Sequence, residues 1–202
     1  QKLEELLTSS YGLTKEGISP YGIIAIASRH HNLISTATVL CLLGETWPNA
    51  MELSSKIFQL VDGLDGKANN RSEERSLLPG VRKTLQNLQA AGVTCAVISN
   101  DSRLGIQGFL YKNNLKSLFS NYWSADHHPT KPNPAAVEGL CNKLNLHPSQ
   151  CALIGDADSD LRMAKQAGIG FRLGFTAGWR QPTQLTEHQY LINSWVEVKI
   201  QN

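Results

Sequence analysis

The 202-residue chain lacks a strong excess of charge and any long hydrophobic run. Its 19 lysines and arginines nearly balance 17 acidic residues, which leaves a net charge of +2 and no visible basic stripe. This pattern excludes the electrostatic footprint that nucleic-acid-binding domains carry. No apolar run approaches the length of a membrane span. We therefore expect a protein with no nucleic-acid partner and no membrane segment.

The four cysteines lack the CxxC or CxxxC spacing of a metal or redox motif. Two of them, Cys95 and Cys151, fall in predicted core strands. We therefore interpret the cysteines as small buried hydrophobic residues that stay reduced in the cytoplasm. The sequence also lacks internal repeats and low-complexity tracts. A chain of this length can bury one domain with an additional subdomain.

Three acids follow directly after one apolar run, Ala152–Gly155, and precede a helical pattern that stops at Gly168. A buried strand that delivers carboxylates to its carboxyl end places them where open α/β sheets bind ligands. Two carboxylates about 6 Å apart repel each other by roughly 2–3 kcal/mol at an effective dielectric near 20. Mg²⁺ would remove this repulsion. The alternative is that Asp158 or Ser159 caps the following helix while Asp156 stays solvated.

A second apolar run begins at Val93 and ends in Ser99, Asn100 and Asp101. A serine at the carboxyl end of a strand can donate its hydroxyl to a phosphate oxygen, and backbone N–H groups of the next turn can join it. The alternative is that these three residues turn the chain and cap a helix.

A third motif is Thr130–Pro134, in which two prolines hold Lys131 in an extended loop. Pro134 suits the first turn of the next helix. A lysine on a rigid loop can meet a phosphoryl group as a point charge, although a lone loop lysine can also be merely solvated.

In this order, the serine, lysine and Gly-Asp-x-x-x-Asp motifs resemble motifs two, three and four of the haloacid dehalogenase superfamily. The resemblance covers residues 76–202, and it is greatest to phosphoglycolate-phosphatase-like members with a helical cap. It implies an α/β fold, namely a Rossmann-like parallel sheet with an α-helical cap subdomain. We expect the cap at residues 1–75 and the α/β core at 76–202, with their boundary in the polar segment 63–76.

Periodicity within the expected core alternates between strands and helices, which favours a parallel sheet with right-handed crossovers. We expect helices at 80–90, 102–113, 134–144 and 159–167, and strands at 93–99, 121–125, 151–155 and 169–173. Residues 1–61 predict helices interrupted near Gly12, at 17–20 and at Trp47.

The resemblance assigns roles to individual residues. Ser99 and Lys131 would be catalytic and, with Asn100, would bind the phosphoryl group of the substrate. Asp156 would bind Mg²⁺, and Asp160 would be a further catalytic acid that orients Lys131 or the water shell of the metal. For Asp158, a helix-capping role fits as well.

The first motif of this superfamily, an apolar strand that ends in Asp-x-Asp, does not occur in the 202 residues. Its first aspartate is the nucleophile that becomes an aspartyl-phosphate. The pair Asp62 and Asp65 has the wrong spacing and lies among glycines that predict a turn, so we reject it as a replacement. We expect the nucleophile upstream of residue 1, on a strand in the middle of the sheet. Without that strand, the strands at 93–99 and 151–155 would face an unpaired gap.

The function predicted is a Mg²⁺-dependent phosphatase that acts on a small phosphorylated metabolite, in the cytoplasm, as a monomer or homodimer. Three alternatives remain: a phosphomutase, a dehalogenase of the same superfamily, and a non-catalytic protein that keeps the phosphate and metal site. Arg29 could grip a substrate anion or lie on an exposed helix face. We interpret His127 and His128 as loop residues and all four tryptophans as packing residues.

Overall fold

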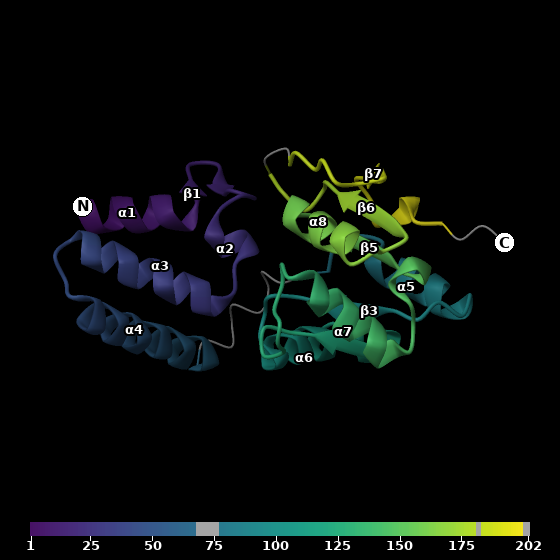
Figure 1. Cartoon of the computed structure of the whole chain (residues 1–202), viewed down its shortest axis with the longest axis horizontal. Coiled ribbons are helices and arrows are strands. Elements are labelled where there is room, and N and C mark those ends of the chain that lie inside the picture. Colours follow the sequence, from purple (N-terminus) through teal and green to yellow (C-terminus); the bar gives the residue numbers. More distant parts are fainter. Residues whose placement is uncertain (68–76, 181–182, 200–202) are drawn as a thin grey trace. The chain divides into compact units, whose positions relative to one another are not determined.

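The computed structural model describes residues 1–67, 77–180 and 183–199. The chain divides into two compact units, Gln1–Arg75 and Ser76–Asn202. In Figure 1 the first unit runs from purple to blue and the second from teal to yellow.

The first unit is mainly helical, and its helix α3 contacts both α1 and α4 (Figure 1). Its elements are α1 (Lys2–Tyr11), β1 (Leu13–Thr14), β2 (Gly17–Ile18), α2 (Ile23–Ile26), α3 (Arg29–Leu42) and α4 (Trp47–Lys67). Helix α1 ends where Gly12 adopts a left-handed conformation with φ of 74°, which glycine accepts without steric cost. Helix α3 begins at Ser28, whose side chain accepts a hydrogen bond from the His31 N–H.

Three details of this unit correct the sequence predictions. The short antiparallel hairpin of β1 and β2 was not foreseen. Helix α4 continues through the glycines that predicted a turn and reaches Lys67; the rest of the expected boundary segment, residues 68–76, lies outside the described residues. Trp47 is 50% exposed at the start of α4, so its interpretation as a packing residue was wrong.

The second unit alternates helices with parallel strands, which confirms the predicted α/β fold. Its helices are α5 (Val81–Ala90), α6 (Arg103–Lys112), α7 (Pro134–Leu144) and α8 (Asp158–Gln166). Its strands are β3 (Ala96–Ile98), β4 (Asn121–Trp123), β5 (Ala152–Gly155), β6 (Phe171–Phe175) and β7 (Tyr190–Ile192). Its described residues also form the short 3₁₀ turns η2 (Lys116–Leu118), η3 (Pro148–Gln150) and η4 (Trp195–Glu197).

The strands form two parallel groups. Strand β3 pairs with β4, with Ile98 opposite Trp123, and β5 pairs with β6, which in turn pairs with β7. In the described part of the chain, β3 is bonded to β4 alone and β5 to β6 alone. One edge of β3 and one edge of β5 therefore have no strand partner among these residues.

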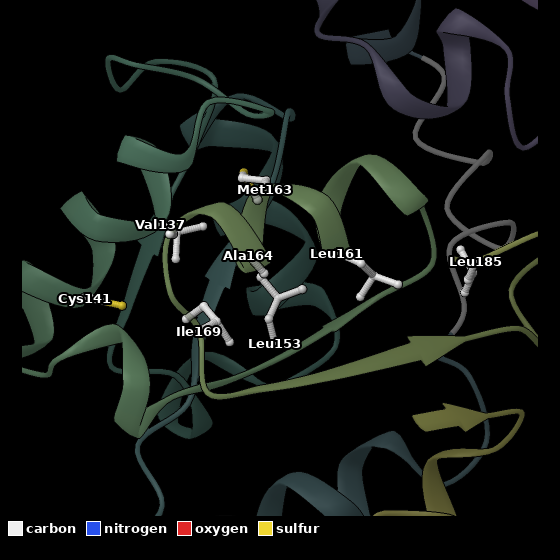
Figure 2. Close-up of a cluster of buried hydrophobic side chains, with 9 residues drawn as sticks. Val137, Cys141, Leu153, Leu161, Met163, Ala164, Ile169 and Leu185 are labelled. Carbon is white, nitrogen blue, oxygen red and sulfur yellow. The ribbon is translucent and has the colours of Figure 1, made fainter. Parts of the chain in front are cut away.

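The largest buried cluster lies around α8 and anchors β5 (Figure 2). Leu161, Met163 and Ala164 of α8 are at most 1% exposed. Figure 2 shows them beside Leu153 of β5 and Val137 of α7. Because these side chains fix α8 against β5, the turn that joins the two elements is held firmly. That turn carries Asp156.

A second buried cluster fixes the elements that surround β3. It joins α5, α6 and the segment after α6, and its buried members are Leu85, Ile106, Leu110, Leu115 and Leu118. Val97 of β3 and Tyr122 of β4 pack against it. The carboxyl ends of both strands, where Ser99 and Ser124 follow, are therefore supported by apolar packing.

Candidate active site

The predicted site residues follow the carboxyl ends of strands in the second unit. Ser99 follows β3, Lys131 lies in the loop after β4, and Asp156 follows β5. Each chain segment leaves its strand through a turn with local hydrogen bonds. These turns determine which polar groups reach the site.

Ser99 extends the pairing of β3 by one residue, because its N–H donates to the Trp123 carbonyl at 2.9 Å. Its Oγ accepts a hydrogen bond from the Asp101 N–H at 3.1 Å. A hydroxyl that accepts one bond can still donate its own proton, for example to a phosphate oxygen. The backbone of Asn100 and Asp101 forms the turn that places this hydroxyl at the end of the strand.

Ser102 caps helix α6, so the expectation that Ser99, Asn100 or Asp101 caps this helix was wrong. Its side chain accepts a hydrogen bond from the Gly105 N–H at 3.0 Å. The capping role that was considered for the three preceding residues therefore belongs to Ser102. Asp101 instead accepts a bond from the Ser102 N–H at 2.7 Å, and its carboxylate occupies the space where a Cβ of Gly105 would lie.

Lys131 lies in a four-residue turn closed by a hydrogen bond from the Asn133 N–H to the Thr130 carbonyl, 3.0 Å long. The peptide bond between Lys131 and Pro132 is cis. Asn133 then caps α7 by accepting from the Ala135 N–H at 3.0 Å, and Pro134 is the first residue of the helix. This confirms the expected helix at 134–144. Lys131 lies in the loop that leads to it, but this loop is a closed turn, so the expectation of an extended loop was wrong.

An ion pair connects Lys131 to helix α8. Lys131 Nζ lies 2.8 Å from Asp160 Oδ1, and the two side chains are only 13% and 14% exposed. A pair so shielded from water interacts more strongly than a surface ion pair. It also links the loop after β4 to the first turn of α8, and so joins the two groups of strands at one site.

Gly155 permits the close approach of α8 to the end of β5. A Cβ at this position would lie 3.0 Å from the Asp160 Cβ, which is tighter than ordinary packing allows. The glycine of the Gly-Asp-x-x-x-Asp motif thus gives Asp160 room to reach Lys131. This provides a physical reason for the residue types and the spacing of the motif.

Asp156 is a half-buried carboxylate beside this ion pair. Burial raises its pKa, and the negative charge of Asp160 raises it further; the Lys131 cation and the Trp179 indole oppose the shift, and the pKa remains above its ordinary value. The Trp179 indole nitrogen is buried and has no hydrogen bond of standard geometry. Gly178 also lies close, since its Cβ would be 3.6 Å from Asp156 Oδ2. Sequence reasoning had treated Trp179 as packing and missed this proximity.

The donor atoms around Asp156 fit Mg²⁺. Mg²⁺ prefers carboxylate oxygens, keeps several waters and is usually held by one or two carboxylates together with substrate phosphates. A cation at Asp156 would also relieve the repulsion from Asp160 that raises its pKa. Within the described ranges, no group of three or more His, Cys, Asp or Glu side chains could hold a metal ion.

Asp158 binds the chain segment at Thr186 and Glu187 instead of capping helix α8. Oδ1 accepts from the backbone N–H groups of Thr186 at 2.6 Å and Glu187 at 3.1 Å, and Oδ2 accepts from the Thr186 hydroxyl at 2.9 Å. Burial alone would raise its pKa, but these bonds and Arg162 hold the pKa of Asp158 below its ordinary value. The N-cap of α8 is Ala157, so the prediction that Asp158 or Ser159 caps the helix was wrong.

Arg29, in the first unit, is engaged within that unit. Its guanidinium lies 2.6 Å from Asp62 Oδ1 and donates to the Phe58 carbonyl at 2.9 Å. It joins the start of α3 to the end of α4. The exposed helix face is therefore the better description of Arg29, and Asp62 is its partner.

His127 belongs to the loop after β4, as expected, and contacts residues of the second unit. Its ring stacks on Trp123 with centroids 4.8 Å apart, and Nδ1 accepts from the Ser124 N–H at 3.0 Å.

Comparison with known proteins places the chain in a family. Residues 38–173, more than half of the chain, match the model of the haloacid dehalogenase-like hydrolase family. The chain therefore belongs to the haloacid dehalogenase-like hydrolases. It is 29% identical over 126 residues to the phosphoglycolate phosphatase of Vibrio vulnificus strain CMCP6, covering 60% of this chain and 54% of that protein. It is 27% identical over 169 residues to that of Vibrio parahaemolyticus, covering 78% and 72%.

The chain spans about half the length of the curated relatives that it matches first. Among solved structures, it resembles a predicted phosphoglycolate phosphatase from Haemophilus somnus with a TM-score of 0.70 and 21% identity, covering 97% of this chain and 88% of that one. A dehalogenase structure matches with a TM-score of 0.59 and 18% identity, covering 96% and 80%. These likenesses show the fold. No described helix has the length and apolarity required to cross a membrane.

Proposed function

We propose that this chain belongs to a Mg²⁺-dependent phosphatase that hydrolyses a small phosphorylated metabolite. The observation that carries the proposal is the shielded ion pair of Lys131 and Asp160 beside the half-buried Asp156. A cation next to two carboxylates, at the ends of parallel strands, suits a phosphoryl group and a metal ion together. The matched relatives named phosphoglycolate phosphatase support the same class of substrate.

Ser99, Asn100 and Lys131 would bind the phosphoryl group. The Ser99 hydroxyl would donate to a phosphoryl oxygen, and the Asn100 N–H would add a second donor. The Lys131 ammonium would neutralise charge on the phosphoryl group while Asp160 holds it in position. Positioning and charge neutralisation are the main demands of phosphoryl transfer.

Asp156 would be the residue that holds Mg²⁺. When bound, the ion supplies positive charge that stabilises the phosphoryl oxygens and the attacking carboxylate. The Trp179 indole would help to keep the Asp156 carboxylate in place, since it favours the charged form of that group. Asp158 would act structurally, since its two oxygens are engaged by Thr186, Glu187 and Arg162.

The nucleophile would be an aspartate on a strand that pairs between β3 and β5. Among the described residues, each of these strands has one edge without a strand partner. A strand in this position would end beside Ser99 and Asp156. Its carboxylate would attack the phosphorus atom and break the P–O bond to the metabolite, which leaves as its alcohol, so that an aspartyl-phosphate forms. Water would then attack that phosphorus atom, release inorganic phosphate and restore the aspartate. The mainly helical first unit would serve as the cap that selects the substrate.

The test is a substrate screen with the full-length protein and Mg²⁺. 2-Phosphoglycolate, sugar phosphates and nucleotides are compared, with and without EDTA. Release of inorganic phosphate that requires Mg²⁺ and is lost in Lys131→Ala supports the proposal. Turnover of 2-haloacids or isomerisation of a sugar phosphate would replace it with a dehalogenase or a phosphomutase. Phosphate binding without turnover would indicate the non-catalytic alternative.

A further inference from the structure

Trp123 contacts the segments that carry both of the predicted phosphate-binding side chains. Its carbonyl accepts a hydrogen bond from the Ser99 N–H at 2.9 Å. Its indole Nε1–H donates to the Pro129 carbonyl at 2.9 Å, two residues before Lys131. The side chain is only 7% exposed, so the indole bond is shielded from water. One residue thus fixes the end of β3 and the loop after β4.

Gly139, in the interior of α7, makes room for this indole. A Cβ at Gly139 would lie 2.3 Å from the Trp123 Cη2 atom, closer than real Cβ contacts occur. Glycine inside a helix costs about 1 kcal/mol relative to alanine. The ring therefore lies directly against the helix backbone, and any larger residue at 139 would displace it.

Two further side chains restrict the indole. The His127 ring stacks on it at an interplanar angle of 26°, and Lys143 Nζ lies 5.0 Å from the ring centre. Lys143 Nζ also lies 2.9 Å from His127 Nε2. The orientation of the indole N–H toward the Pro129 carbonyl is therefore set by packing as well as by the hydrogen bond.

We infer that Trp123 is a positioning residue, which determines the position of Lys131 relative to Ser99. It acts through the hydrogen bond from its indole to the Pro129 carbonyl and through the packing of its ring against Gly139. This inference rests on the proposed function. A lysine that neutralises a phosphoryl group acts only at the right distance. A displacement of about 1 Å can cost roughly a hundredfold in rate.

The test is a double-mutant cycle in the full-length protein, with p-nitrophenyl phosphate as substrate and saturating Mg²⁺. Trp123→Phe keeps most of the ring and removes the N–H donor, and Gly139→Ala displaces the ring. Each is expected to lower kcat about ten- to a hundredfold with a smaller change in KM. In a Lys131→Ala background, Trp123→Phe is expected to cause no further loss, because the residue it positions is gone.

Trp195→Phe is the matched control. Trp195 is a half-buried tryptophan of the second unit. Its indole nitrogen has no hydrogen-bond partner, and the centre of its ring lies 5.6 Å from that of Phe175. Its ring packs against Phe175 rather than against the loop of Lys131, so its replacement is expected to leave kcat unchanged. Melting temperatures of all variants are recorded, to separate loss of folded protein from loss of rate.

Two results would overturn the inference while leaving the phosphatase proposal intact. One is that Trp123→Phe lowers kcat by the same factor in the wild type and in the Lys131→Ala background. The other is an equal loss from Trp195→Phe. If the wild type binds inorganic phosphate without turnover, the same cycle is measured on phosphate affinity by calorimetry, with the same outcomes. If it neither hydrolyses nor binds phosphate, the proposed function is wrong and the inference falls with it.

Discussion

Lys131 Nζ lies 2.8 Å from Asp160 Oδ1, in a contact that is largely shielded from solvent. The two residues come from different segments: Lys131 from the loop before α7, and Asp160 from the first turn of α8. Their pairing brings the loop after β4 to the turn after β5. The fold thereby assembles a cation and two carboxylates at the site proposed for phosphoryl transfer.

Breaking this pair is expected to impair both activity and stability. Lys131→Ala should lower kcat by about 10²–10³-fold, because a positioned charge is lost from the transition state. A double-mutant cycle of Lys131→Ala and Asp160→Asn, measured by urea unfolding, should give a coupling of about 1–3 kcal/mol in the free energy of unfolding. A coupling near zero would show that the pair adds nothing to the fold. A mild effect on kcat would remove Lys131 from the proposed mechanism.

Asp156→Asn is expected to abolish Mg²⁺-stimulated phosphatase activity, since the amide is a poorer ligand and carries no charge. Asp158→Asn is the matched control, because this neighbouring carboxylate is engaged by Thr186 and Glu187. The control should retain the Mg²⁺ dependence of the wild type. Rates are measured across a Mg²⁺ titration. Full activity in Asp156→Asn would contradict the metal assignment.

Asp158 and Asp156 should affect stability with opposite dependence on pH. The pKa of Asp158 is lowered, so its contribution to stability is present above the unfolded pKa of about 4 and is lost as pH falls through the folded pKa. The pKa of Asp156 is raised, so the folded state binds its proton more readily and stability declines as pH rises from ~4 through the folded pKa.

Melting temperatures measured from acidic to neutral pH in EDTA test these signs. At neutral pH, Asp158→Asn should melt below the wild type and Asp156→Asn above it. Both differences should shrink on acidification, as the wild-type carboxyls become protonated. Parallel curves for either variant and the wild type would contradict the corresponding shift.

Leu161→Ala should destabilise the second unit by about 2–5 kcal/mol, because it opens a cavity in the cluster around α8. Leu161 is fully buried, at 0% exposure, and packs against the element that leads to Asp156. Leu104→Ala on α6 is the control: that side chain is 75% exposed and its loss should change stability by at most about 0.5 kcal/mol. Urea denaturation compares the two. Similar losses would mean that burial does not determine the effect.

Local sequence signals were sufficient to predict most helices and strands of the second unit. Helix α7 runs from Pro134 to Leu144, as predicted, because Asn133 and Pro134 define its start and the apolar spacing defines its buried face. Strand β6 was predicted two residues too early, and β7 was missed. The pairing partner of β7 is β6, so β7 depends on a contact between distant segments rather than on its own short pattern.

The order of the three motifs, and with it the family, could be inferred from the sequence because each motif is a short run of residues at the end of a strand. The tertiary structure decided what each polar side chain contacts. Asp158 is bound by residues near 186, and Trp123 reaches Pro129 while its ring rests on Gly139. The contacts of Asp158 and the packing of Trp123 on Gly139 join different elements, and they depend on how α7 and α8 pack against the strands. Local propensity carries no information about that packing.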